Sequence, residues 1–185
     1  MKIKFIRKKN NYDVSQLISH WIYNSFSLLG DAALSFIGPC QVKENLIDLI
    51  DRRKDNFIYS PAMLHFIVEH FGVSLKEIVL RQRILVAIVA EEINFIKGQM
   101  IINRKGNDLF YNDKKLSVSI ATVSRVSGLI HLGLNISLDK KVPVDAACLT
   151  ALKIKPEELA KKVLQRYAEE QDNFKKSLVK VRSVD

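Results

Sequence analysis

A carboxylate and a lysine stand on either side of a predicted turn in the middle of the chain. Asn112-Asp113 is typical of a hairpin turn, because Asn and Asp tolerate the positive φ that such a turn requires. A turn there places Asp108 and Lys115 on neighbouring strands. A lysine held on a strand among apolar residues can stabilise charge that develops on a carbonyl or phosphoryl oxygen. The alternative is a surface hairpin whose charges are simply solvated.

Hydroxyl side chains follow Lys115 along the next predicted strand. Because side chains alternate along a strand, Lys115, Ser117 and Ser119 should share one face. A polar stripe on an interior face is unfavourable unless it lines a wet pocket, so this pattern favours a site there. The other interpretation is that this face is the solvent side.

Other patterns with chemical potential are weaker. His65 and His70 are five residues apart, which puts them on different faces of a helix and opposite faces of a strand, so we expect no metal site. The sequence contains no GxxxxGK[ST], GxGxxG or GxSxG motif. The two cysteines, Cys40 and Cys148, form no CxxC pair, which argues against a disulfide scaffold and against a four-cysteine zinc site.

The positive charge is concentrated at the N-terminus. The chain has 185 residues with 29 Lys plus Arg and 20 Asp plus Glu, giving a net charge of +9. Residues 1–10 hold five basic and no acidic side chains. This segment is either a solvated strand edge or a contact for nucleic acid or another anionic ligand.

The hydrophobic pattern indicates a globular protein without a membrane span. At 48% hydrophobic and 26% charged residues, the composition is that of an ordinary folded domain. The longest apolar run, residues 84–90, is far shorter than the roughly 20 residues that a bilayer requires. The basic N-terminus has no apolar segment or cleavage site typical of a signal peptide, so we expect a cytoplasmic protein with reduced thiols.

Helical spacing appears in three segments. Residues 13–30 should form an amphipathic helix with Asp13 as N-cap and Gly30 as C-cap. Residues 74–96 carry a continuous apolar stripe that begins at a Ser74 cap, and residues 156–182 form a final helix after an N-terminal proline.

Strand patterns account for most of the rest. Alternation over residues 2–6 predicts a strand, and residues 32–37 should form another that ends at Gly38-Pro39. Residues 48–56 read as loop, and 63–71 fit either a strand or a helix. The period-2 segments between 99 and 137 predict one antiparallel meander with strands at 99–103, 108–111, 116–123 and 129–137. The sum is a single α+β domain over 1–185, with a mostly antiparallel sheet, helices on one face and a C-terminal helix packed on it.

The hairpin resembles the core of biotin protein ligases. The matching stretches are Asn107 to Tyr111, Lys114 to Leu116 and Leu129 to Ile136, in the same order and with similar spacing. The resemblance implies that Lys115 is the catalytic lysine that contacts the carboxyl and phosphoryl oxygens of an acyl-adenylate. It also implies that Asn107 and Asp108 lie beside the ligand.

A second stretch is similar to octanoyltransferases. Residues 34–42 resemble the segment that lines the acyl pocket of those enzymes, which implies that Gly38 and Pro39 shape a pocket wall. That family uses a lysine and a cysteine, and the resemblance pairs Lys115 with Cys148 as nucleophile. The alternative for Cys148 is a buried small hydrophobe. Both families share a sheet-and-helix fold related to the catalytic core of class II aminoacyl-tRNA synthetases.

The whole chain resembles a prokaryotic family called domain of unknown function 366. The resemblance rests on residues 38–40, 63–71, 115–122 and 143–144. It supports the fold and implies no particular reaction.

Two functional hypotheses follow. In the first, the protein transfers or activates a lipoyl, biotinyl or fatty-acyl group, with a small acyl or nucleotide ligand and an acyl-carrier or lipoyl-domain protein as partner. Lys115 and Cys148 would be catalytic, and the ligand would contact Asn107, Asp108, Gly38, Pro39, Ser117 and His131. His131 could instead be a core histidine. ATP with Mg²⁺ is left open, because residues 30–33 lack the arginine of the ligases' Gly- and Arg-rich loop.

The second hypothesis is a non-catalytic module that binds a nucleotide, a cofactor or an RNA end on the same fold. Its phosphate contacts would come from Lys2, Lys4, Lys8 and Arg104.

Overall fold

A computed structural model of the protein describes residues 1–43, 46–54, 56–142 and 144–184. Pro143, part of one of the matching stretches, and Asp55, part of the predicted 48–56 loop, lie outside the described residues.

A five-stranded sheet forms the centre of the fold. Its order is β1-β2-β3-β8-β7, and all neighbouring strands are antiparallel except β1 and β2, which are parallel. The α+β class and the mostly antiparallel sheet are therefore confirmed. The strands are β1 Lys2–Ile6, β2 Ala32–Val42, β3 Ile58–Phe71, β7 Ser117–Val123 and β8 Ser127–Ser137.

The central strand β3 resolves the ambiguous segment 63–71 as a strand. Its residues 63–70 are all buried, because both faces of the sheet are covered. A strand buried on both faces carries apolar residues without clear alternation, so its sequence pattern fits a helix equally well.

The predicted meander is split between two sheets. β4 (Ile102–Lys105), β5 (Asp108–Tyr111) and β6 (Lys114–Lys115) form a separate three-stranded sheet. The chain leaves this sheet at Leu116, whose backbone bonds both sheets: its N–H donates to the carbonyl of Leu109, and its carbonyl accepts from the N–H of Asn135. The prediction of one continuous meander is wrong, because the period-2 pattern does not show where pairing partners change.

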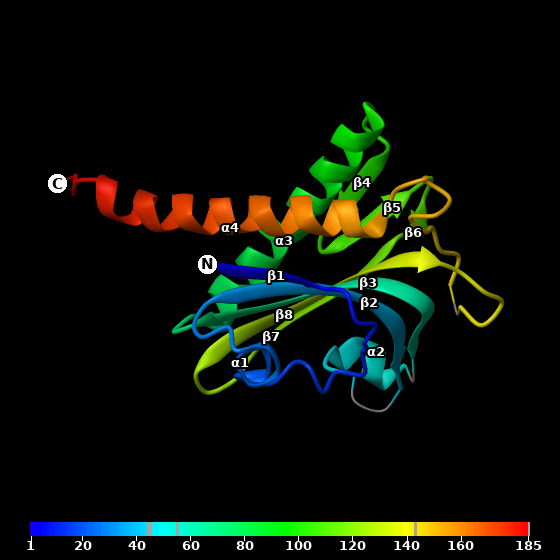
Figure 1. Cartoon of the computed structure of the whole chain (residues 1–185), viewed down its shortest axis with the longest axis horizontal. Coiled ribbons are helices and arrows are strands. Elements are labelled where there is room, and N and C mark those ends of the chain that lie inside the picture. The colour runs from blue at the N-terminus through cyan, green and yellow to red at the C-terminus, as the bar shows by residue number, and fades with distance from the viewer. Residues whose placement is uncertain (44–45, 55, 143, 185) are drawn as a thin grey trace.

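Two long helices cover one face of the large sheet, as expected (Figure 1). α3 (Leu75–Lys97) is capped by Ser74, whose Oγ accepts from the N–H of Glu77 at 3.2 Å. Gly98 caps its C-terminal end. α4 (Pro156–Lys180) crosses α3 and then projects beyond the body of the molecule, where its last turns are exposed (Figure 1). Their buried side chains form one core with the sheet residues beneath them.

The opposite face is covered by irregular chain and two short helices, α1 (Trp21–Phe26) and α2 (Leu49–Arg53) (Figure 1). The predicted helix over 13–30 is therefore reduced to six residues. Val14 and His20 adopt positive φ angles of 79° and 63°, which break helical hydrogen bonding. Asp13 does not cap a helix but accepts from the N–H and hydroxyl of Ser15. The 48–56 segment, predicted as loop, contains α2.

Strand β2 continues through Gly38-Pro39, where we expected it to end. The register shifts between Gly38 and Cys40, so Pro39 lies at a bulge, where its missing N–H does not interrupt the ladder. The carbonyl of Pro39 accepts from the N–H of Tyr12, and the segment around Tyr12 lies beside β2. A proline at a bulge therefore does not end the strand.

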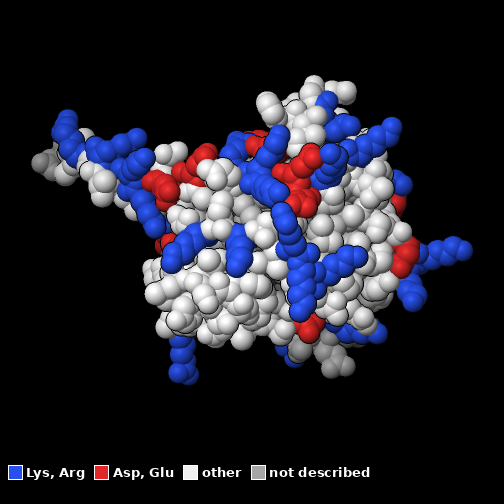
Figure 2. All heavy atoms as spheres, viewed as in Figure 1, with Lys and Arg blue, Asp and Glu red and all other residues white. Residues whose placement is uncertain are grey.

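Basic side chains mark one edge of the sheet. β1 is an edge strand on which Lys2 and Lys4 are exposed. Figure 2 shows Lys and Arg side chains on the face that carries β1 and along the projecting end of α4. Lysines on an edge strand oppose pairing with another chain. Among the helices of the described ranges, none is long and apolar enough to cross a membrane.

Candidate functional site

A cavity of about 530 Å³ lies at the β7 edge of the large sheet, and it is lined by His131 and Met63 from the face opposite α3 and by Ser119, which bonds to α3. Register partners in an antiparallel pair share a face, so Met63 and Asn135 of β3 and β8 face it together with His131. The small sheet closes one end, and the segment around α2 closes another side. The apolar lining side chains are Val14, Val42, Leu46, Ile47, Ile50, Phe57, Ile58, Met63, Val118, Ile120, Val142 and Val144.

Lys115 and Asp108 meet at the small-sheet end of this cavity. The Lys115 Nζ lies 3.0 Å from Asp108 Oδ1, and both side chains line the cavity. Lys115 is the last residue of β6, where its backbone bonds to Asp145 and Ala147 fix its position. The Lys115 side chain is 37% exposed, so it is accessible to a ligand while it stays paired.

Asn107 and Ser117 lie beside this ion pair, and both line the cavity. The Asn107 Nδ2 donates to the carbonyl of Ser119 at 3.0 Å, which leaves its side-chain oxygen available to a ligand. The Ser117 Oγ accepts from the N–H of Leu109 at 2.9 Å and thereby ties β5 to β7.

The polar stripe beyond Lys115 lies in the interior and is satisfied by the fold. The Ser119 Oγ accepts from Gln82 Nε2 of α3 at 2.8 Å and donates to the carbonyl of His131 at 3.1 Å. The buried amide of Gln82 is thus a hydrogen-bonded core group.

His131 belongs to a buried histidine pair. Its Nε2 lies 3.0 Å from Nδ1 of His65, and the His65 Nε2 lies 3.2 Å from the carbonyl oxygen of Gly38. Burial lowers the pKa of His65 to about 4, and burial together with the nearby His65 lowers the pKa of His131 well below its ordinary value. Both rings are therefore neutral at pH 7.

The carbonyl of Gly38 fixes the tautomers of this pair. A carbonyl oxygen only accepts, so the His65 Nε2–H donates to it, and the unprotonated His65 Nδ1 accepts from the His131 Nε2–H. The remaining nitrogen, His131 Nδ1, is then an acceptor. His131 lines the cavity, so it is both a core histidine and a cavity residue.

Tyr12 covers the histidine pair. Its ring stacks on His131 with a centroid distance of 3.6 Å and an interplanar angle of 14°. Its hydroxyl is buried and has no hydrogen-bond partner among the described residues. Burial raises the pKa of this hydroxyl, so it stays protonated. Tyr12 therefore lines the cavity and carries a buried hydroxyl that no described residue satisfies.

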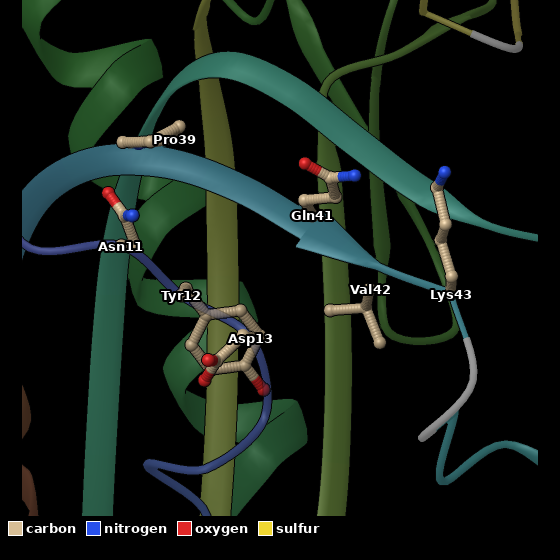
Figure 3. Close-up of a pocket in the computed structure, with 7 residues that line it drawn as sticks. All are labelled: Asn11, Tyr12, Asp13, Pro39, Gln41, Val42 and Lys43. Atoms are coloured by element: carbon tan, nitrogen blue, oxygen red, sulfur yellow. The ribbon is translucent and has the colours of Figure 1, made fainter.

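Gly38 allows Tyr12 to reach this position. A Cβ on Gly38 would lie 1.7 Å from the carbonyl oxygen of Asn10, so the 10–12 segment crosses β2 in contact with its backbone. Gly38 does not line the cavity. Pro39 lines an adjoining hollow of about 420 Å³ together with Asn11, Tyr12, Asp13, Gln41, Val42 and Lys43 (Figure 3). Gly38 and Pro39 thus contact the segment that carries Tyr12, and it is Tyr12 that lines the cavity.

Cys148 is not among the described side chains that line the cavity. It is partly buried, and its neighbours Ala147 and Leu149 bond to the Asn135 side chain and backbone. The structure therefore brings together Lys115, Asp108, Asn107, Ser117 and His131, but it does not bring the Cys148 thiol into the same cavity.

Tyr12, His65 and Asn135 are site residues that the sequence analysis did not assign to the ligand. Asn135 lay within the resembling strand, and His65 was considered only as a metal ligand paired with His70. Tyr12 had no local signal, because its place depends on a close crossing far along the chain.

The fold places the chain among proteins similar to biotin and lipoate ligases. The biotin protein ligase of Aquifex aeolicus superposes with a TM-score of 0.64 at 17% identity, covering 95% of this chain and 72% of the ligase. Lipoate-protein ligase A bound with ATP gives a TM-score of 0.61 at 16% identity, covering 91% and 85%. At these identities the likeness shows the fold.

The chain belongs to the family described as Domain of unknown function (DUF366), which it matches over residues 1–182. A protein of unknown function from Pyrococcus horikoshi has 35% identity and a TM-score of 0.91, with both chains fully covered. The uncharacterized protein MJ0805 of Methanocaldococcus jannaschii is 35% identical over 97% of this chain and 84% of its own length.

The described cavity lining does not fit the triphosphate of ATP. Its charged side chains are three carboxylates, Asp48, Asp51 and Asp108, and one ammonium, Lys115. A triphosphate needs several cationic groups or backbone donors around it, and a surplus of carboxylates repels it.

Proposed function

We propose that the cavity binds the acyl group of a small carboxylic acid and that the protein transfers a lipoyl, biotinyl or fatty-acyl group. The observation that carries this proposal is that Lys115, paired with Asp108, is the one Lys or Arg among the described lining residues of a cavity whose lining is half apolar. An apolar tail gains free energy from burial against the aliphatic lining. The carbonyl group is then held at Lys115.

Lys115 acts by stabilising negative charge on the acyl oxygen. When a nucleophile attacks the acyl carbon, the carbonyl oxygen becomes an oxyanion, and a fixed ammonium at hydrogen-bond distance lowers that barrier. Asp108 holds the ammonium in place at 3.0 Å until the ligand arrives. Asn107 and Ser117 border the same oxygen position.

The acyl donor is an already activated group, such as the thioester of an acyl-carrier or lipoyl-domain protein. The carboxylates around the cavity disfavour a triphosphate, so activation by ATP within this site is not part of the proposal. Attack by the acceptor's nucleophile breaks the thioester bond and releases the donor thiol.

Cys148 would be needed only for a covalent acyl-enzyme. Its place outside the cavity lining favours direct transfer to the acceptor. A Cys148→Ser protein should therefore keep the transfer rate of the wild type, whereas a covalent route through this thiol would abolish transfer.

Ligand binding tests the proposal. Octanoate, lipoate and biotin are compared with ATP and a short RNA by thermal shift. A ligand at a hundredfold over its dissociation constant adds about 2.7 kcal/mol to the free energy of unfolding, which raises Tm by roughly 5–10 °C for a chain of this size. We expect a carboxylic acid to stabilise the protein and Lys115→Met to remove most of this effect.

A binding module without catalysis is the second candidate. The position of Cys148 outside the lining and the acidic character of the cavity favour it over an ATP-dependent ligase. Its phosphate contacts would come from Lys2, Lys4, Lys8 and Arg104. Stabilisation by RNA alone, unchanged in Lys115→Met, would support the module and refute acyl transfer.

A further inference from the structure

The cavity has a second polar region at Tyr12 and His131, away from Lys115, which an acyl pocket for a plain hydrocarbon chain does not require. Asn135 lies next to the Lys115–Leu116 backbone, and His131 precedes it by four residues on the same strand. At about 3.3 Å per residue, His131 is roughly 13 Å along β8 from the lysine end. This separation is comparable to the length of an extended medium-chain carboxylic acid.

Tyr12 and His131, whose rings are stacked, each carry a polar atom without a bond among the described residues. The tautomers imposed by the Gly38 carbonyl leave His131 Nδ1 as an acceptor with no bond from any described residue. The Tyr12 hydroxyl, on the ring stacked against His131, is buried without a partner. Buried polar groups almost always have partners, so the partnerless Tyr12 hydroxyl, on a ring stacked against His131 with its open Nδ1, calls for a ligand group that satisfies it.

The two groups are complementary to a hydroxyl or an N–H-bearing polar group. His131 Nδ1 accepts one hydrogen bond, and the Tyr12 O–H donates one. A ligand group that both donates and accepts, such as an alcohol, an amide or a urea, satisfies both at once. A methyl group satisfies neither and leaves the Tyr12 hydroxyl buried and unpaired.

We propose that Tyr12 and His131 form a specificity site that selects acyl groups with a polar, hydrogen-bonding group at the far end of the chain. This inference rests on the proposed function, because it assumes that the carboxyl end of the ligand lies at Lys115. His65 is a positioning residue in this site, since it fixes the tautomer of His131 without lining the cavity itself.

The test compares two ligands of nearly equal size, 8-hydroxyoctanoate and nonanoate, which differ by a terminal hydroxyl in place of a methyl. Their dissociation constants are measured by isothermal titration calorimetry with the full chain. We expect the hydroxy acid to bind roughly 3- to 10-fold more tightly, the value of about one net hydrogen bond.

Tyr12→Phe should reduce this preference by a similar factor, because it removes the hydroxyl and adds no atom. Tyr59→Phe is the matched control. Tyr59 also lines the cavity, but its hydroxyl already donates to Asp139 at 2.8 Å, so its removal should leave the preference unchanged.

The outcomes separate the two proposals. If nonanoate binds as tightly as the hydroxy acid, or if Tyr12→Phe keeps the full preference, the polar end holds only water and the specificity site is refuted while acyl binding stands. If neither acid binds, the proposed function fails, and the specificity site fails with it. A preference lost in Tyr12→Phe and kept in Tyr59→Phe establishes the site.

Discussion

The buried histidines should make the free energy of unfolding fall as the pH drops from about 6.5 towards 4. His65 and His131 are almost completely buried, and their pKa values lie below the ordinary value of 6.5, that of His65 at about 4. Burial also lowers the pKa of His70, although Asp31 partly opposes this effect. At a pH between the ordinary histidine pKa of the unfolded chain and the lowered pKa of the folded protein, the unfolded chain binds protons that the folded protein does not.

The sign and size follow from proton linkage. Below pH 6.5 the histidine takes up a proton in the unfolded chain but stays neutral in the folded protein, which favours the unfolded chain. The histidine therefore leaves the free energy of unfolding unchanged above pH 6.5 and lowers it as the pH falls towards the folded pKa. Each histidine contributes a slope of up to about 1.4 kcal/mol per pH unit. Three such groups give at most about 4 kcal/mol per unit.

Carboxylates affect a lower pH range. Burial alone would raise the pKa of Asp31, but bonds from His70 and the N–H of Phe71, with Lys175 nearby, lower it overall. A lowered carboxyl pKa stabilises the fold above the ordinary value of 3.8, and this stabilisation is lost as the pH falls below that value. Measurements between about pH 4.5 and 6.5 therefore isolate the histidines.

Urea denaturation at several pH values, followed by circular dichroism, measures the slope. We expect His65→Gln to reduce it by up to about 1.4 kcal/mol per pH unit, provided that the variant has the wild-type spectrum at pH 7. A wild-type free energy of unfolding that stays constant from pH 6.5 to 4.5 would refute the neutral, buried pair and with it the tautomer assignment of His131.

Three other predictions concern single residues. Lys115→Met should remove acyl binding in calorimetry. It should change the free energy of unfolding by less than about 1 kcal/mol, because the ion pair of Lys115 is partly exposed. A large loss of stability would show that Lys115 has a structural role instead. Gly38→Ala should destabilise the protein by about 2–4 kcal/mol in urea denaturation, because the added Cβ displaces the 10–12 segment and its backbone hydrogen bonds, and wild-type stability would contradict the close crossing. Tyr12→Phe should leave the ligand-free protein equally or more stable in the same assay, since the hydroxyl it removes has no partner; a loss above about 1 kcal/mol would mean that the hydroxyl is bonded in the fold.

Local patterns predicted the elements whose signals lie within a few residues. The Ser74 cap and the apolar stripe of α3, the proline start of α4 and the Asp108–Lys115 hairpin all appear in the structure as expected. The long helix over 13–30 failed, because its apolar side chains pack on the sheet from turns. The same spacing of apolar residues fits both a helix and an irregular segment. Long-range bonds, such as that from the His20 N–H to Glu69, favour the irregular segment.

The sequence by itself determined the α+β class, the two long helices and the pairing of a lysine with a carboxylate across a short turn, because these depend on neighbours in the chain. The tertiary structure alone decided that the hairpin forms a sheet of its own, that Cys148 stays outside the cavity, and that Tyr12 lies over His131 and His65. Those arrangements join residues tens of positions apart through close packing at Gly38 and burial of imidazoles. No periodicity encodes such contacts, since they depend on the distance between backbones that meet only in the folded chain.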